Sequence, residues 1–274
     1  MPRVAATRVR RAAFVAATAV LLIGALAACA PGGEPVESDQ GPAIDECPSG
    51  AVAIGTSASD LQNALDAAQP GSAIRLADAT YAGHFTITVS GSDGAPITLC
   101  GSAAAVIDGG SNDSGYALHL DGASHWVVRG FTVTGAAKGI MLDSSSHNEL
   151  QDLTVSNTGQ EGVHLRAGSS DNLVQGLVVS DTGKTTPEYG EGIYIGTATS
   201  NWCDISACEP DRSDRNRVLD NKVFDVTAEA VDVKEGTTGG ELRGNDLTLG
   251  DTPAVDSVVD LKGNEWTVSA NHGP

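Results

Sequence analysis

The sequence is 274 residues long, carries a formal net charge of −19 and contains only 4% aromatic residues. This negative charge argues against a nucleic-acid-binding protein, which would present a basic surface. It would also repel an anionic polysaccharide unless cations or local lysines intervene. Because aromatic residues are so few, the core has to be built from Val, Ile, Leu and Ala.

Residues 1–28 have the features of a secretory signal peptide: four arginines between positions 3 and 11, an apolar run from Ala12, and small residues before Cys29. The apolar run is too short and too rich in Ala for a permanent membrane span. The ending Leu-Ala-Ala-Cys is similar to a bacterial lipobox. The similarity implies an extracellular protein, cleaved before Cys29 and anchored to the cell membrane by a lipid on its sulfur; release without a lipid is the alternative. Loss of the four arginines, which have no acid beside them, takes the charge from −19 to −23.

Residues 29–46 are rich in Pro, Gly and acidic residues, which is typical of a flexible tether. Four more cysteines follow it. An even number of cysteines in an exported protein favours disulfides, and zinc is disfavoured because no second Cys or His cluster has ligand spacing. We expect Cys203 to pair with Cys208 in one polar loop, and Cys47 to pair with Cys100.

A short helix is expected near the start of the domain that spans residues 47–274. Its pattern begins at Ser59, places Leu61 and Leu65 on one apolar face, and ends at Pro70. Short alternating strands follow, up to Leu99. A helix in this place would cap the open end of a stack of strands.

From residue 105 onward one strand pattern recurs. Each copy has aliphatic residues in its first and third positions, and the first positions are Leu118, Ile140, Val163, Ile193, Val231 and Val259. The copies are 22, 23, 30, 38 and 28 residues apart, and the extra residues fall in polar stretches, as stacked coils tolerate. The pattern predicts an all-β fold, a single-stranded right-handed parallel β-helix with a short N-terminal capping helix.

Two further features concern the turns and the end of this domain. Asn148, Asn172 and Asn216 align at one turn, each before an apolar residue, and predict either an inward ladder of amides or ordinary turn asparagines. The sequence stops at Pro274 part way through a coil, so we expect either an exposed last rung or a C-terminally truncated domain. We expect a monomer.

The second and fourth residues of each strand should point to the outer face, where they form two columns. These columns are His119, Met141, His164, Tyr194, Asp232 and Asp260, and beside them Asp121, Asp143, Arg166, Gly196, Lys234 and Lys262. Glu161, Glu191 and Glu229 precede successive strands, about 5 Å apart. Carboxylates this close repel one another unless a cation lies among them, and oxygen ligands favour Ca²⁺. The alternative is that the insertions splay them into water.

Three early segments, residues 65–71, 74–81 and 95–99, resemble the N-terminal part of β-helix polysaccharide lyases. Residues 229–234 are similar to the active-site stretch of the chondroitinase B and alginate lyase family, in which an acid five residues before a lysine binds calcium and the lysine is the base. The resemblance implies that Glu229 is a calcium ligand, Lys234 the base and Asn221 a further ligand. The chain departs from that family at Thr227, where another acid is usual, at Glu235, where a serine is usual, and at Lys262, which replaces the catalytic arginine.

These residues predict calcium-assisted β-elimination on a uronate-containing polysaccharide. The reaction needs a neutralised carboxylate, a base for the C5 proton and a donor for the leaving oxygen. Lys234 would be the base, and Arg166 or Lys262 would bind the substrate carboxylate or protonate the leaving group. The expected calcium ligands are Glu161, Glu191, Glu229 and Asn221, and the expected sugar contacts are His164, Tyr194, Asp232 and Trp202.

Two other functions remain open from the sequence. A non-catalytic carbohydrate-binding or surface-display β-helix would need none of this chemistry. A glycoside hydrolase would use Asp232 and Asp260, whose expected separation of about 5 Å suits a retaining geometry.

Overall fold

Three parallel sheets make up the computed structural model of the chain, which describes residues 47–274. The predicted signal peptide, Cys29 and the tether lie outside the described residues. The first sheet has nine strands, in the order β1 (Val52–Ala53), β2 (Ala73–Arg75), β5 (Ile97–Cys100), β8 (Trp126–Arg129), β11 (Glu149–Gln151), β14 (Leu173–Gln175), β17 (Arg217–Leu219), β20 (Glu241–Arg243) and β23 (Thr267–Ser269).

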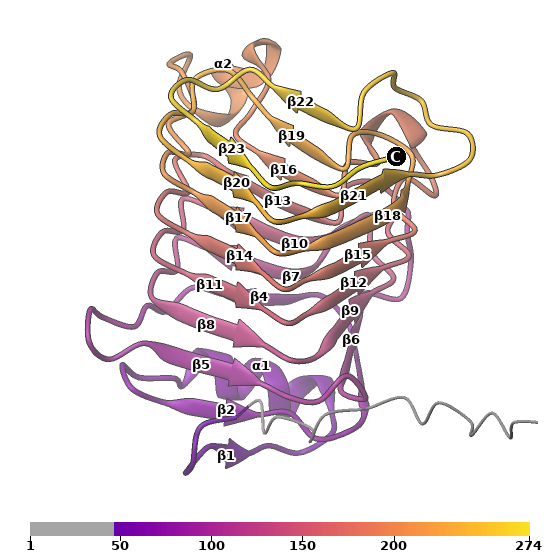
Figure 1. Cartoon of the computed structure of the whole chain (residues 1–274). Coiled ribbons are helices and arrows are strands. Elements are labelled where there is room, and N and C mark those ends of the chain that lie inside the picture. Colours follow the sequence, from indigo (N-terminus) through magenta and orange to yellow (C-terminus); the bar gives the residue numbers. More distant parts are fainter. Residues whose placement is uncertain (1–46) are drawn as a thin grey trace, which may run out of the picture. The chain divides into compact units, whose positions relative to one another are not determined.

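The second and third sheets have seven strands each. The second contains β3 (Thr80–Ala82), β6 (Val106–Asp108), β9 (Thr132–Thr134), β12 (Thr154–Ser156), β15 (Val178–Ser180), β18 (Lys222–Val226) and β21 (Asp246–Leu249). The third contains β4 (Phe85–Ile87), β7 (Tyr116–Asp121), β10 (Lys138–Asp143), β13 (Val163–Arg166), β16 (Ile193–Ile195), β19 (Val231–Val233) and β22 (Val259–Leu261). Figure 1 shows the three ladders, to which each successive coil adds one strand.

The register of the third sheet is the one that the repeat predicts. Ile140 pairs with Leu118 on one side and with Val163 on the other, and Val231 pairs with Ile193 and Val259. Except in β22, the last strand of this sheet, aliphatic side chains in these positions are fully buried in the coil, together with most of those of the other two sheets. The predicted parallel β-helix is therefore confirmed, with a core of aliphatic side chains stacked from coil to coil.

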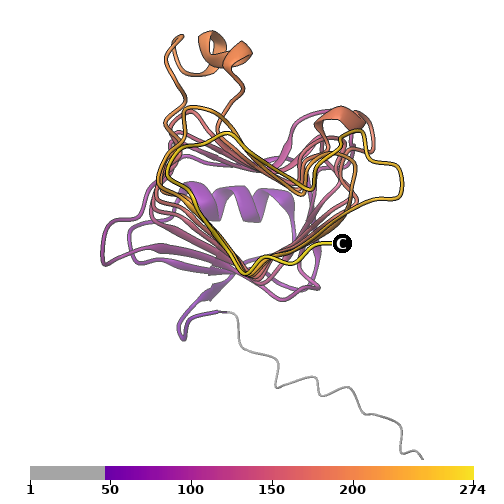
Figure 2. The ribbon, with the colours of Figure 1, turned by 45° about the horizontal axis from the view of Figure 1, so that its top comes forward.

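The predicted capping helix is α1 (Ala58–Asp66). Ser57 and Asp60 form a capping box, in which the Asp60 amide donates to Ser57 Oγ and the Ser57 amide donates to Asp60 Oδ2, both at 3.1 Å. The helix therefore starts earlier than the predicted Ser59. Leu61 and Leu65 are fully buried, and Figure 2 shows the helix lying within the outline of the coil. Within residues 47–274, no helix is long and apolar enough to cross a bilayer.

Two ladders of asparagine amides run through the turns inside the coil. Asn148 Nδ2 donates to Asn172 Oδ1, and Asn172 Nδ2 donates to Asn216 Oδ1, each at 3.1 Å, which confirms the inward ladder. A second ladder, which the sequence analysis missed, joins Asn221 through Asn245 to Asn271. Each amide also caps a backbone carbonyl, so these buried turns leave few unpaired polar groups.

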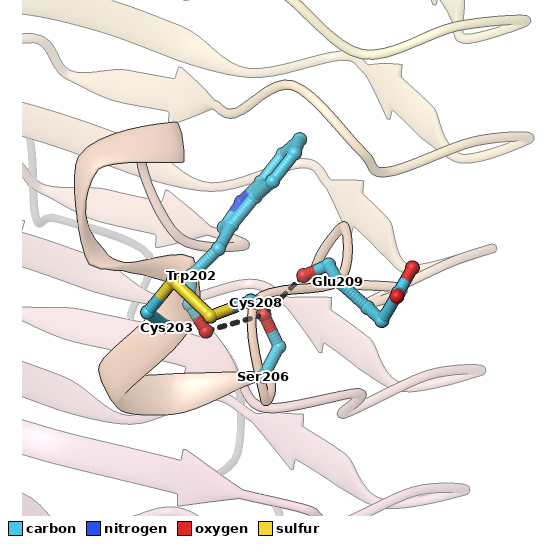
Figure 3. Close-up of a disulfide and its surroundings, with 5 residues drawn as sticks. All are labelled: Trp202, Cys203, Ser206, Cys208 and Glu209. Atoms are coloured by element: carbon cyan, nitrogen blue, oxygen red, sulfur yellow. Dashed lines mark hydrogen bonds between the residues drawn. A yellow bond between two sulfur atoms is a disulfide. The ribbon is translucent and has the colours of Figure 1, made fainter.

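Both predicted disulfides are present. Cys47 is bonded to Cys100, and Cys203 is bonded to Cys208. The second disulfide lies in the insertion that contains η2 (Thr199–Asn201) and α2 (Trp202–Ile205), and it joins Cys203 in α2 to Cys208 just beyond that helix. Figure 3 shows Ser206 Oγ inside this loop donating to the carbonyl groups of Trp202 and Glu209. The loop is thus closed covalently and by its own hydrogen bonds.

Candidate active site

A groove of about 610 Å³ lies along the outer face of the third sheet, between two loop insertions. One insertion precedes β16 and contains η1 (Pro187–Tyr189), and the other follows β16 and contains α2. Figure 2 shows the two loops projecting from the coil on either side of that sheet. They account for the long 30- and 38-residue steps of the repeat. The charged and aromatic residues of the floor are Lys138, Glu161, His164, Arg166, Glu191, Tyr194, Glu229, Asp232, Lys234, Asp260 and Lys262.

The outer column of the third sheet is largely buried. His164, Tyr194 and Asp232 occupy successive rungs, as predicted, but their exposed fractions are only 3%, 9% and 1%. Period-2 patterning gives the face of the sheet to which a side chain points. It does not show that long insertions will fold over that face, so the sequence analysis missed the burial.

Tyr194 lies between a histidine and a lysine. Its ring centroid is 4.1 Å from that of His164, and Lys234 Nζ lies 5.2 Å from the same ring. Burial, reinforced by the negative charges of Asp232, Glu191 and Glu161, raises the pKa of Tyr194 far above its usual value. The phenol therefore keeps its proton at neutral pH.

Lys234 is held above the sheet by a buried acid. Its Nζ lies 2.5 Å from Asp232 Oδ2, and it is half-buried in the groove. Burial raises the pKa of Asp232 to about 6, and the Lys234 ammonium offsets part of this rise. Lys262, one rung further along, forms its own ion pair with Asp260 at 2.5 Å and also interacts with Asp232.

Three of the acids form a triad. Glu191, Glu229 and Asp232 each offer a carboxylate oxygen within 4.8 Å of the others. Glu191 Oε2 and Asp232 Oδ1 are buried without a hydrogen-bond partner among the described residues, whereas Asp232 Oδ2 lies against Lys234 Nζ. Burial, together with the charge of Glu161, raises the pKa of Glu191 to about 8. Oxygen donors that lack partners fit a hard cation such as Ca²⁺, and protonation of Glu191 relieves the same repulsion when no cation is bound.

Glu161 lies apart from this triad. Its Oε1 is 2.5 Å from Lys138 Nζ and 3.3 Å from His164 Nδ1. Burial alone would raise the pKa of Glu161, but His164 and Lys138 outweigh it and hold the pKa at about 2. His164 Nε2 donates to the Gly196 carbonyl at 2.9 Å, which fixes the imidazole against Tyr194. The structure therefore places Glu161 in a buried ion pair rather than with the other two predicted ligands.

Two of the predicted site residues are placed wrongly by the sequence analysis. Asn221 is buried in the second asparagine ladder, where Nδ2 donates to the Val174 carbonyl and Oδ1 accepts from the Leu177 amide, so it cannot reach a cation in the groove. Trp202 does not line the groove; its indole N–H donates to the Thr197 carbonyl at 2.8 Å and anchors the base of α2.

Arg166 does line the groove, at the end nearer the N-terminal coils. Its guanidinium is already bound by Asp143, with Nε 2.6 Å from Oδ1, and it donates to the Tyr116 hydroxyl. His119 Nε2 lies 2.9 Å from the same Asp143 carboxylate. The sequence placed Asp143 beside Arg166 but assigned it no role. The structure shows that it sets the orientation of the arginine.

Comparisons with known proteins agree with this architecture. The family model described as "Right handed beta helix region" matches residues 57–251. An alginate lyase from Paenibacillus sp. str. FPU-7 is 36% identical, with 81% of this chain and 76% of that chain covered and a TM-score of 0.76. The pectate lyase Pel9A is 19% identical, with 83% and 64% covered and a TM-score of 0.60. ORF18 of Geobacillus virus E2 is 16% identical, with 81% and 48% covered and a TM-score of 0.62. No curated protein matches the chain significantly. Because their identities are low, the pectate lyase and ORF18 structures support the fold alone.

Proposed function

The chain belongs to the right-handed β-helix family as a polysaccharide-lyase-like member, and from this premise we propose that it cleaves a uronate-containing polysaccharide by β-elimination. The observation that carries the proposal is the contact between Tyr194 and Lys234 on the floor of a groove that is open to a polymer. The 36% identity to an alginate lyase makes alginate the first substrate to test.

The reaction removes the C5 proton, breaks the C4–O bond to the leaving sugar and forms a C4=C5 double bond. Lys234 in its neutral form accepts the C5 proton, and Tyr194 donates a proton to the leaving oxygen. The phenol is protonated before the reaction, and the positive charge that Lys234 gains with the C5 proton, 5.2 Å from the ring, favours release of the phenolic proton. His164, which stacks on this ring and is fixed by the Gly196 carbonyl, holds the donor in place.

The substrate carboxylate has to be neutralised to make the C5 proton acidic. Lys262 lies beside Lys234 and can contribute positive charge, and Arg166 can bind the carboxylate of a sugar further along the groove. We propose that Glu191, Glu229 and Asp232 hold a Ca²⁺ ion, which would supply further positive charge when bound. A rise in melting temperature on adding Ca²⁺, lost in Glu229→Gln, would support this site independently of activity.

The decisive experiment is to incubate the purified protein with alginate, polygalacturonate and chondroitin and to follow the absorbance of the unsaturated uronate. Product should appear with at least one polymer, and Lys234→Ala should lower the rate by at least about 100-fold. Lys222→Ala is the matched control, because Lys222 is an exposed lysine on the second sheet. New reducing ends without unsaturation would instead indicate hydrolysis, for which Asp232 and Asp260 are the adjacent carboxylates.

A carbohydrate-binding protein without catalysis is the second candidate. The close ion pair between Lys234 and Asp232 favours it, because a lysine held as an ammonium by a buried carboxylate is not a base. Binding of a uronate polymer, with no unsaturated product in the presence or absence of Ca²⁺, would identify this function.

We also propose that the protein is exported and anchored to the cell membrane through a lipid on Cys29, acting as a monomer. The support for export and anchoring is the sequence of residues 1–29 alone. Cell fractionation should find the protein in the membrane fraction, and Cys29→Ala should change this distribution. The molar mass of residues 47–274, measured by light scattering, would test whether the protein is a monomer.

A further inference from the structure

We propose that Tyr189, on the rim of the groove, is a sugar-stacking residue that binds the apolar face of a pyranose ring in the bound polysaccharide. The inference rests on the proposed function only in requiring that the groove binds uronate glycans. It adds a binding residue that the sequence analysis did not consider, because Tyr189 belongs to no strand of the repeat.

Tyr189 is the one large, exposed hydrophobic side chain within residues 47–274 that lines the groove. Its exposed fraction is 57%, and it is the only aromatic residue among the large hydrophobic side chains that are exposed within residues 47–274. The others are Val52, Val178, Leu261 and Val268, none of which lines the groove. Within residues 47–274, no ring–ring or cation–π contact involves Tyr189, so no other ring or cation competes with a ligand for its exposed side chain.

The loop that carries Tyr189 is fixed on both sides. Thr182 Oγ1 donates to the Gly190 carbonyl at 2.5 Å, and Thr227 Oγ1 donates to the Pro187 carbonyl at 2.8 Å. The Thr186 amide donates to the Gly159 carbonyl, and the Tyr189 amide donates to that of Thr186. Because the backbone is held before a ligand arrives, binding costs little conformational entropy.

The chemistry of the groove explains why a sugar is the fitting ligand. The floor is charged, so it suits carboxylates and hydroxyls. An aromatic ring on the rim instead offers the negative face of a π-system to the weakly positive C–H groups on one side of a pyranose. Ile205 lines the groove from the loop on the other side of the third sheet. The polymer therefore meets charged groups on the floor and, among the polar side chains of the walls, an apolar surface on either side at Tyr189 and Ile205.

The test is calorimetric binding of an alginate tetrasaccharide to the Lys234→Ala protein, in which cleavage is blocked. We expect Tyr189→Ala in this background to weaken binding about tenfold. Tyr189→Phe should bind within about twofold of the parent, because the ring face is kept. Val178→Ala, which removes an exposed apolar side chain outside the groove, should change nothing. In the protein that keeps Lys234, Tyr189→Ala should raise KM by a similar factor.

The outcomes separate this inference from the lyase proposal. If Tyr189→Ala binds as tightly as its parent, or if Tyr189→Phe is as weak as Tyr189→Ala, the stacking role is wrong whether or not product forms. If the oligosaccharide binds through Tyr189 but no unsaturated product forms from any polymer, only the lyase proposal fails. If no uronate oligosaccharide binds, both are wrong.

Discussion

Glu191 is a buried carboxyl group whose nearest charged neighbours are other carboxyl groups. Its burial and the charge of Glu161 raise its pKa to about 8, whereas Lys138 and His164 hold the pKa of Glu161 at about 2. Two glutamates on adjacent rungs therefore differ in protonation at neutral pH, because only Glu161 has a lysine and a hydrogen-bonding histidine beside it. The sequence shows their spacing but not this difference, since Lys138 reaches Glu161 from a preceding rung.

This difference predicts how the stability of the cation-free protein depends on pH. Glu191 has a higher pKa in the folded than in the unfolded state, so the folded state binds its proton more tightly. Its contribution is fully present below about pH 4.5, and it is lost as the pH rises towards about 8. The contribution of Asp232 to stability is likewise lost as the pH rises, and this loss is complete near its folded-state pKa of about 6. With a chelator present, the melting temperature should fall between pH 5 and 8.5.

Glu191→Gln should remove most of this fall and raise the melting temperature at pH 8.5 by about 5 °C, because the amide cannot ionise. Thermal unfolding followed by circular dichroism across this pH range measures both effects. Glu149→Gln, on the first sheet and outside the groove, is the matched control. A fall that is equally steep in Glu191→Gln and in the parent would mean that Glu191 is not the titrating group.

The coils are held in register by repeated elements, and the asparagine ladders are the polar part of this repetition. Asn172 Oδ1 accepts from the backbone amide of Asn148 at 2.9 Å. Asn172 Nδ2 donates to Asn216 Oδ1 and to the Ser145 carbonyl. Removing this one side chain leaves several buried polar groups without a partner, and such groups cost about 1–3 kcal/mol each. The ladder could be predicted from aligned asparagines, but its inward orientation could not be distinguished from ordinary turns without the packing of the next coil.

Asn172→Ala should therefore lower the free energy of unfolding by roughly 3 kcal/mol or more. Because solenoids can unfold in parts, the melting temperature and the number of transitions should both be recorded. Asn63→Ala, at an exposed position of α1, should have little effect. Equal stabilities of the Asn172→Ala and Asn63→Ala proteins would contradict a structural role for the ladder.

The two disulfides act on different elements. Cys47 and Cys100 are 53 residues apart and tie the start of the domain to β5, whereas Cys203 and Cys208 are 5 residues apart and close only the α2 loop. The insertion that contains α2 is attached to the segment after β19 that carries Lys234, because Glu235 accepts hydrogen bonds from the backbone amide and the hydroxyl of Thr199. Cys spacing was sufficient to predict both bonds. It could not show that one of them shapes a wall of the groove.

We expect the double variant Cys203→Ser, Cys208→Ser to raise KM several-fold while changing the melting temperature by only a few degrees. The double variant Cys47→Ser, Cys100→Ser should instead keep the parent KM and lower the melting temperature more strongly. Closing its longer loop removes more unfolded-state entropy, which stabilises the fold by about 4 kcal/mol, against about 2 kcal/mol for the Cys203–Cys208 bond. Kinetics and thermal unfolding of the two double variants make the comparison. If both variants lost stability alike and kept the parent KM, the α2 loop would not shape the binding site.

The whole molecule combines a regular solenoid with irregular insertions, and these two parts were not equally predictable. The spacing of Leu118, Ile140 and Val163 predicted the correct register, because residues that pair in adjacent coils occupy the same position of the sequence repeat. The walls of the groove come from the insertions around β16, whose positions depend on tertiary contacts such as Thr227 with Pro187. Tyr189 and Trp202 therefore needed the structure, and the only signals for them were aromatic residues within over-long, polar steps of the repeat.

The charge of the whole molecule opposes its proposed substrate. The chain has 35 acidic and 16 basic residues. The four basic side chains on the floor, Lys138, Arg166, Lys234 and Lys262, are each already paired with a carboxylate. Long-range repulsion of a polyuronate should therefore dominate the encounter at low salt, when the Debye length is about 30 Å, and should be screened at 0.15 M, when it is about 8 Å.

Raising NaCl from 10 to 150 mM should therefore lower KM for a polyuronate by about threefold, with little change in kcat, in contrast to a basic enzyme, whose KM would rise. Initial rates measured at one fixed Ca²⁺ concentration, so that the divalent cation does not vary with the salt, test this directly. Above about 0.5 M the ion pairs between substrate and groove should weaken in turn, and KM should rise again. A KM that rises steadily from the lowest salt concentration would show that attraction by the floor lysines, rather than the net charge, governs binding.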